Sequence, residues 1–148
     1  MKIFKNINFA SDVEGFLTNR EGCLLYSLAY ACQNRGSIVE IGSFKGKSTI
    51  WLANGIKNKN SSTKVYTIDP YAGVLRSNDQ DIPGGTFGDF KNNIKKANIE
   101  NFIVPIVKTS KDARKNFNQP IELLFIDGLH EFEYVNEDYH LWTDLIVT

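Results

Sequence analysis

Short apolar runs rich in β-branched residues alternate along the chain with segments in which apolar residues recur at helical spacing. The runs predict strands and the spaced segments predict helices. The predicted strands cover residues 37–42, 64–70, 102–107 and 121–126. The predicted helices cover residues 21–34, 48–56, 86–97, 110–120 and 132–146. Strands that alternate with helices predict an α/β protein with a parallel sheet.

Three local signals refine this pattern. Pro105 lies inside the third predicted strand and favours an edge position, since proline cannot donate to a strand ladder. Thr86 and Asp89 resemble a helix capping box. The connection from Tyr71 to Gly85 is long for a compact domain, and connections of that length are usually functional or mobile.

Length and charge narrow the function classes. A chain of 148 residues fits a single domain, so we expect one domain over residues 1–148. Lys+Arg and Asp+Glu are equal at 17 each, which gives no net attraction to nucleic acid or to an anionic membrane. The sequence contains neither an evident secretory signal nor an apolar run of ~18 residues. We therefore expect a cytoplasmic protein with no nucleic-acid or membrane partner.

The two cysteines, Cys23 and Cys32, fall on one predicted helix. At ~1.5 Å rise per residue they are too far apart to form a disulfide. We expect two buried thiols in a reducing compartment.

Acidic residues lie at or near the ends of three of the predicted strands. Glu40 lies near the end of the first strand and Asp69 near the end of the second, and Asp127 follows the fourth. Because the carboxyl ends of parallel strands meet at one edge, these acids should share a rim of the sheet with the glycine turn 42–46. A single strand-end acid is more often a solvated or capping residue. Three of them beside a glycine turn favour a binding site.

The glycine turn limits the choice of ligand. Its Gly-Ser-Phe-Lys-Gly sequence lacks the middle glycine of a dinucleotide fingerprint and is one residue short of a P-loop, so a nucleotide hydrolase is the weaker alternative. Asp69 suits ribose hydroxyls and Glu40 suits an ammonium. The amides and hydroxyls of residues 42–48, at a helix N-terminus, suit a carboxylate. Ribose, ammonium and carboxylate are parts of S-adenosylmethionine (SAM).

Four segments in order resemble class I SAM-dependent methyltransferases. V-E-I-G-S-F-K-G-K-S-T resembles their first motif, V-Y-T-I-D-P their second strand, and V-K-T-S-K the segment that reaches the adenine. L-F-I-D-G-L-H-E-F-E-Y resembles the I-D-G-x-H-x-Y segment of the small O-methyltransferase-like family that includes antibiotic-tailoring sugar methyltransferases. The resemblance runs from about Gly15 to the last residue.

The resemblance implies a fold, a cofactor and a reaction. The fold is a Rossmann-like sheet with parallel strands in the order 3-2-1-4 and flanking helices. The reaction is SAM-dependent O-methylation of a small-molecule hydroxyl, on a sugar or a phenol, with possible assistance from Mg²⁺. The implied cofactor-binding residues are Glu40, Gly42, Ser43, Gly46, Ser48, Asp69, Thr109, Ser110 and Asp127. Asp127 would also bind the metal, and His130 would be the catalytic base that takes the proton from the hydroxyl.

Several alternatives stay open. Asp127 is either a site residue or a cap of the following turn, and His130 is either a base or an exposed first-turn residue. Tyr66 and Tyr71 are expected in the core, and the alternative is that they line the acceptor pocket. His140 is expected to have a surface or packing role.

The chain also departs from the family. Leu129 stands where the family commonly has an acid or a small polar residue. Related chains continue past the final helix into three further strands, which supply metal ligands and part of the substrate pocket. We therefore expect either a homo-oligomer that pairs through the exposed edge of the fourth strand or the N-terminal part of a longer protein. The alternative function is a non-catalytic SAM-binding or interaction module.

Overall fold

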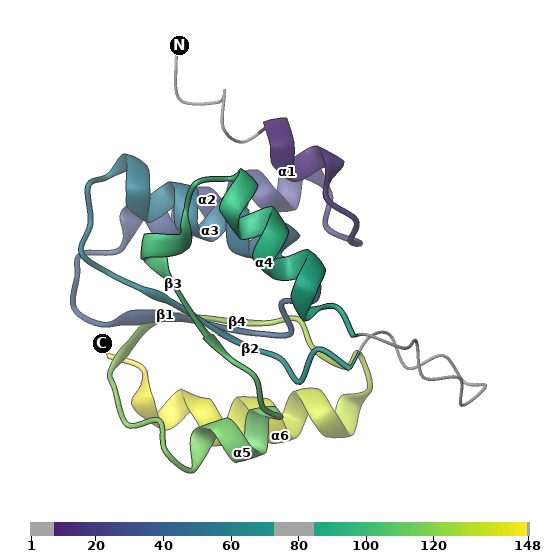
Figure 1. Cartoon of the computed structure of the whole chain (residues 1–148). Coiled ribbons are helices and arrows are strands. Elements are labelled where there is room, and N and C mark those ends of the chain that lie inside the picture. The colour runs from purple at the N-terminus through teal and green to yellow at the C-terminus, as the bar shows by residue number, and fades with distance from the viewer. Residues whose placement is uncertain (1–7, 73–84, 148) are drawn as a thin grey trace.

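The computed structural model of the protein describes residues 8–72 and 85–147 (Figure 1). In these residues one parallel sheet is formed by β1 (Ser37–Ile41), β2 (Val65–Ile68), β3 (Ile103–Ile106) and β4 (Ile121–Ile126). The spatial order β3-β2-β1-β4 confirms the order predicted from the sequence. The helices are α1 (Asn8–Asp12), α2 (Asn19–Ala31), α3 (Lys47–Asn58), α4 (Phe87–Lys96), α5 (Ser110–Arg114) and α6 (Phe132–Trp142), with 3₁₀ turns η1 (Glu100–Phe102) and η2 (Thr143–Leu145).

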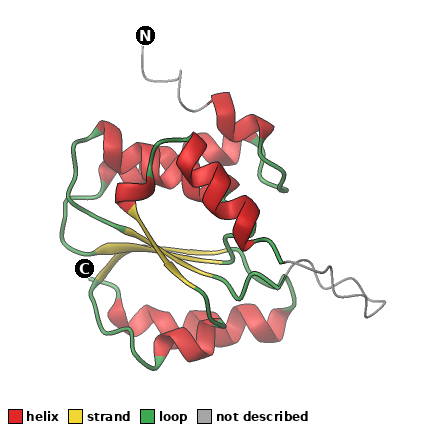
Figure 2. Cartoon of the chain, in the orientation of Figure 1, coloured by secondary structure: helices red, strands yellow, loops and turns green. Residues whose placement is uncertain are grey.

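Helices cover both faces of the sheet. Figure 2 shows α1 to α4 on one face and α5 and α6 on the other. The side chains of β1 alternate between the two layers: Ile38 packs with the core of the α2–α3 layer, whereas Val39 and Ile41 pack with Trp142 of α6. Every residue of β1 is buried, as expected for a central parallel strand. The same alternation turns Glu40 toward α3.

α2 and α3 pack closely because glycines replace bulkier side chains at their contact. A Cβ at Gly22 would lie 2.3 Å from Cε2 of Trp51, and one at Gly55 would lie 2.6 Å from the carbonyl oxygen of Tyr26. α2 begins with a capping box, in which the Thr18 hydroxyl accepts from the Glu21 amide while the Glu21 carboxylate accepts from the Thr18 amide. The box starts the helix two residues earlier than the apolar pattern predicted.

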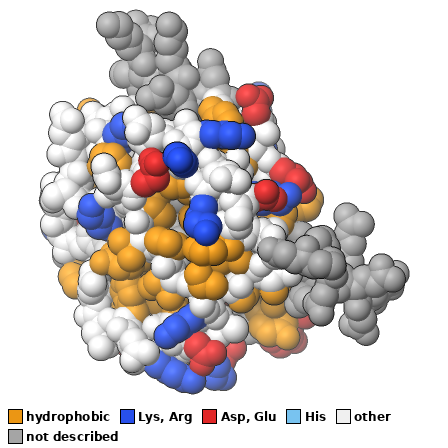
Figure 3. Space-filling view, viewed as in Figure 1, with side chains coloured by type: hydrophobic (Ala, Val, Ile, Leu, Met, Phe, Trp, Pro, Cys, Tyr) orange, Lys and Arg blue, Asp and Glu red, His pale blue; other side chains and the backbone are white. Residues whose placement is uncertain are grey.

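The two edges of the sheet differ. β3 carries the predicted edge proline, Pro105, and pairs only with β2 among the described strands. Apolar side chains lie across the middle of this side of the molecule, between the two helical layers (Figure 3). At the other edge, Ile146 forms a parallel bridge with Ile121 at the start of β4, and the Val147 amide donates to the Ile121 carbonyl over 2.9 Å. The edge of β4 therefore already accepts main-chain pairing at one end.

Four local expectations were wrong. Cys23 is exposed, whereas Cys32 is buried as expected. Thr86 precedes α4 but forms no capping hydrogen bond. α5 ends at Arg114, well before Pro120. Apolar residues at helical spacing from Phe132 to Ile146 predicted one buried helix face. Trp142 is fully buried and Leu145 is partly buried, whereas the other members are exposed; these are Phe132, Val135, Tyr139 and Ile146.

Most of the connection from Tyr71 to Gly85, residues 73–84, lies outside the described residues. No helix in the described part of the chain is both long enough and apolar enough to span a bilayer.

Candidate functional site

The turn between β1 and α3 forms one wall of the candidate site at the carboxyl edge of the sheet. Gly42 has a φ of 84°, and a Cβ there would lie 2.3 Å from the Asp127 carbonyl oxygen. Only glycine therefore lets this turn approach the end of β4 so closely. Phe44 and Gly46 also have positive φ values, of 45° and 88°, and Gly46 ends the turn at the start of α3.

Asp69 holds this turn in place. Its Oδ2 accepts hydrogen bonds from the main-chain amides of Ser43 at 2.9 Å and Phe44 at 2.8 Å. Its Oδ1 accepts from the Tyr71 amide at 2.5 Å. A carboxylate offers roughly four acceptor positions, so about one remains for a ligand. The sequence predicted that Asp69 lies at the rim, but sequence reasoning missed its role as the organiser of the turn.

The Tyr71 hydroxyl contacts the turn at Ser43, and sequence reasoning missed this supporting role as well. Its hydroxyl lies 3.0 Å from the Ser43 hydroxyl and 3.3 Å from the Thr67 hydroxyl. Its ring packs against Phe87 and Phe90 of α4, with centroid distances of 4.7 and 5.1 Å. Burial is the main cause that raises the pKa of Tyr71 to about 12, so the phenol stays neutral. Tyr71 is therefore a core residue, as expected, and it links the turn to α4.

Glu40 lies beneath the start of α3 and is fully buried. Its Oε2 accepts from the Thr49 hydroxyl at 2.5 Å, whereas its Oε1 has no partner among the described groups. Burial raises the pKa of Glu40 to about 7, the nearby Ser48 and Thr49 hydroxyls lower it, and the charges of Asp127 and Asp69 raise it further. Asp69 and Asp127 thus lie close enough to Glu40 to disfavour its negative charge, as expected for acids that share one rim of the sheet.

Asp127 and His130 lie together at the end of β4. The Asp127 amide donates to the Ile41 carbonyl over 2.8 Å, which fixes the residue beside the glycine turn. His130 Nε2 lies 4.0 Å from Asp127 Oδ1, too far for a hydrogen bond, and its side chain is 80% exposed. Burial raises the pKa of Asp127, the charge of His130 lowers it, and Glu21 raises it.

These residues do not fit the expected Mg²⁺ site. Within residues 8–72 and 85–147, no three His, Cys, Asp or Glu side chains are grouped so that they could hold a metal ion. Asp127 and His130 supply one carboxylate and one imidazole, whereas Mg²⁺ prefers several oxygen ligands.

Thr109 and Ser110 lie where β3 leads into α5, at the same edge of the sheet. The Thr109 hydroxyl caps α5 by accepting from the Asp112 amide at 3.2 Å. The Ser110 hydroxyl accepts from Trp142 Nε1 at 2.8 Å and so ties α5 to α6. The half-buried Ser110 therefore has a structural contact in addition to its expected place near an adenine.

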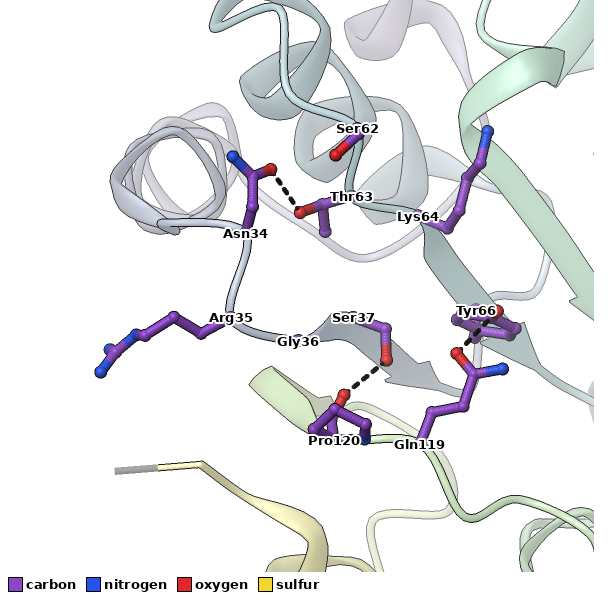
Figure 4. A pocket seen from close by; sticks show the side chains of 10 residues that line it. All are labelled: Asn34, Arg35, Gly36, Ser37, Ser62, Thr63, Lys64, Tyr66, Gln119 and Pro120. Atoms are coloured by element: carbon purple, nitrogen blue, oxygen red, sulfur yellow. Dashed lines mark hydrogen bonds between the residues drawn. The ribbon is translucent and has the colours of Figure 1, made fainter.

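Two cavities lie outside the carboxyl edge of the sheet, one at its opposite edge and one beside the glycine turn. The first, of about 320 Å³, opens at the amino ends of β1, β2 and β4. Figure 4 shows hydrogen bonds that join pairs of its lining residues, Asn34 with Thr63, Ser37 with Pro120 and Tyr66 with Gln119. Tyr66 therefore faces the edge opposite the glycine turn. The second cavity, of about 260 Å³, includes Lys45, which pairs with Glu14 and Asp89.

A parallel sheet in the order β3-β2-β1-β4, with a glycine turn and three acids at its carboxyl edge, defines a Rossmann-like α/β protein of the methyltransferase type. The sequence matches the family described as "Methyltransferase domain" over residues 39–148. The chain belongs to this family.

Solved structures share the fold at low sequence identity. An O-methyltransferase from Bacillus cereus in complex with S-adenosylhomocysteine (SAH) is 20% identical, with a TM-score of 0.66 over 99% of this chain and 60% of that one. The SAM-bound O-methyltransferase TomG from Streptomyces achromogenes, involved in tomaymycin synthesis, is 19% identical, with a TM-score of 0.69 over 97% of this chain and 61% of that one. The chain thus spans about three fifths of the length of these proteins.

Proposed function

We propose that the chain forms the cofactor-binding part of a SAM-dependent methyltransferase that methylates a hydroxyl group of a small molecule, on a sugar or a phenol. The observation that carries this proposal is the glycine turn, held by Asp69 at the N-terminus of α3 and adjoining the buried, partly unpartnered Glu40. Family membership and the SAM- and SAH-bound structures of similar fold support the choice of cofactor.

Each part of the edge suits a part of the cofactor. Asp69 has about one free acceptor position for a ribose hydroxyl. Glu40 meets the ammonium, and the N-terminus of α3 receives the carboxylate, because its first amides lack helical partners. Thr109 and Ser110 lie near the adenine end. Ser43 and Ser48 contribute to the wall of the methionine end.

The transfer needs a proton acceptor for the substrate hydroxyl. When bound, SAM supplies an electrophilic methyl group on its sulfonium sulfur. His130 takes the hydroxyl proton, so that the oxygen keeps the electron pair with which it forms the new bond to the methyl carbon as the carbon–sulfur bond breaks. The exposed position of His130 lets a substrate reach it, and the Asp127 carboxylate lies 4.0 Å from its Nε2.

A methyl-transfer assay with labelled SAM and a panel of sugars and phenols tests this proposal. We expect His130→Ala to lower the rate by ~10²- to 10⁴-fold, the usual effect of losing a general base, while SAH binding is retained. His140→Ala is the matched control, because His140 lies on α6 and packs against Tyr139. Equal activity of the two variants would exclude His130 as the base.

A second candidate function is a non-catalytic SAM-binding or interaction module. The observation that favours it is the distance of 4.0 Å between His130 Nε2 and Asp127 Oδ1, which leaves the expected base without a hydrogen bond to orient it. Folded protein that binds SAH but transfers no methyl group to any acceptor would support this alternative.

We also propose that the edge of β4 is an interface between two copies of the chain. α6 packs against β4 and exposes apolar side chains, with Phe132 78% and Tyr139 55% exposed. The edge segment Leu123–Ile126 contains neither a charge nor a proline that would discourage pairing. Equilibrium sedimentation should show a dimer at micromolar concentrations, and a strict monomer would contradict this proposal.

A further inference from the structure

Glu40 is an unusual group to bury in the centre of a sheet. It lies on β1 between Thr67 of β2 and Phe125 of β4, and none of its surface is exposed. One carboxyl oxygen is bonded to Thr49, and the other, Oε1, has no partner among the described groups. An ionised carboxylate in such a position is costly unless a cation or donors satisfy it. The unpartnered oxygen therefore favours a proton on Glu40 when no ligand is bound.

The charged groups around Glu40 act in the same direction. Asp69 at the end of β2 and Asp127 at the end of β4 both disfavour its negative charge, while the Ser48 and Thr49 hydroxyls of α3 oppose them in part. The phenol of Tyr71 stays neutral, so it adds no cation. A ligand that brings its own positive charge to Oε1 would reverse this balance.

We infer that Glu40 is a proton-releasing specificity residue: binding of a ligand with a primary ammonium group ionises Glu40 and releases its proton to the solvent. The inference rests on the proposed function and adds to it a selectivity for ligands that carry a primary ammonium group. The ammonium supplies the positive charge that the buried site lacks, and it donates a hydrogen bond to the orphaned oxygen. A ligand with the same adenosine and thioether but no amino group leaves Glu40 protonated.

The consequence is a pH-dependent affinity. The pKa of Glu40 in the free protein, about 7, means that about a tenth of the molecules carry the ionised form at pH 6 and about nine tenths at pH 8. Because affinity scales with the fraction of the competent form, SAH binding should weaken about tenfold from pH 8 to pH 6. Binding of 5′-methylthioadenosine, which lacks the amino-acid part, should change little.

The experiment is calorimetric titration of the full chain with SAH and with 5′-methylthioadenosine at pH 6, 7 and 8. Each titration is run in two buffers of different ionisation enthalpy, which gives the number of protons released. We expect SAH to release a fraction of a proton that is largest below pH 7, and methylthioadenosine to release none. The Glu40→Gln variant should bind SAH with little pH dependence and without proton release.

A second variant keeps the inference testable if Glu40→Gln does not fold. Thr49→Val removes the hydrogen bond that favours ionised Glu40, so it should keep the proton release but shift its midpoint to higher pH. SAH binding with pH-independent affinity and no proton release would overturn this inference while leaving the proposed cofactor site intact. No SAH binding at any pH, from folded protein, would overturn both.

Discussion

At the scale of single residues, Gly42 shows how the sequence determines the site. Its positive φ and the contact of 2.3 Å that a Cβ would make with Asp127 are two independent reasons for glycine. The sequence showed a glycine after a strand, which predicts a turn. It also predicted that the turn and the end of β4 share one edge, but not the close contact between Gly42 and Asp127, which depends on tertiary packing.

The Gly42→Ala variant tests this reading. We expect the free energy of unfolding to fall by ~2 kcal/mol or more, because alanine adds both a steric clash and a strained φ. Gly88→Ala is the matched control, since Gly88 lies in α4 with no atom within 4 Å of a built Cβ. That control should be neutral or stabilising by up to ~1 kcal/mol. Urea unfolding of both variants provides the measurement, and equal stability would contradict the role given to Gly42.

The buried Glu40 also makes a prediction about stability. Its pKa is raised from 4.5 to about 7 in the folded protein, so the folded state holds the proton more tightly than the unfolded chain. The free energy of unfolding should therefore fall as pH rises from about 4.5 to about 7 and level off above that range. The full effect is on the order of 3 kcal/mol for this one group.

Urea unfolding of the ligand-free protein at pH 5.5 and pH 8 measures this effect. Glu40→Gln should reduce the difference between the two values, because the amide does not titrate in this range. If stability changes by the same amount between pH 5.5 and pH 8 in the wild type and in Glu40→Gln, the ionisation cost at Glu40 is contradicted.

At the scale of elements, the periodic apolar pattern predicted the strands well, and the capping signals less well. Thr86 and Asp89 have capping-box spacing, yet Thr86 has helical φ and ψ values of −98° and −2°, and its hydroxyl is buried without a partner among the described groups. Asp89 instead pairs with Lys45 at 3.1 Å. The Asp89 carboxylate thus pairs with Lys45 of the glycine turn and does not accept a hydrogen bond from the helix N-terminus, as a capping box would require.

The contact of Tyr71 with α4 makes a prediction at this scale. Tyr71→Phe removes the hydrogen bonds to Ser43 and Thr67 but keeps the ring that packs on Phe87 and Phe90. We expect a loss of about 1 kcal/mol in stability and a few-fold weaker binding of SAH, because the glycine turn is less firmly held.

Tyr26→Phe is the matched control for this substitution. The Tyr26 hydroxyl accepts one exposed hydrogen bond from Asn58, so its loss should change stability by less than ~0.5 kcal/mol and leave binding unchanged. Thermal unfolding and SAH titration of the two variants compare them directly. If Tyr71→Phe behaves like Tyr26→Phe, the hydroxyl of Tyr71 has no part in positioning the turn.

At the scale of the whole molecule, the sequence predicted the strand order and the edge of the sheet at which the acids meet. Both follow from general rules for parallel sheets and from the resemblance of four ordered motifs. The sequence could not predict that the Asp69 carboxylate accepts three main-chain hydrogen bonds. It also could not predict that Phe132 and Tyr139 are exposed while Trp142 is buried. These outcomes depend on tertiary contacts that no local pattern records.

The central claim is that the carboxyl edge of this sheet binds a SAM-type ligand. The most direct measurement is a titration of the full chain with SAH at pH 8, with ATP as the comparison ligand. We predict binding of one SAH per chain with micromolar affinity and no binding of ATP, because the turn is one residue short of a P-loop and Glu40 lies beneath it. ATP binding in the absence of SAH binding, from protein that is folded by circular dichroism, would contradict the account.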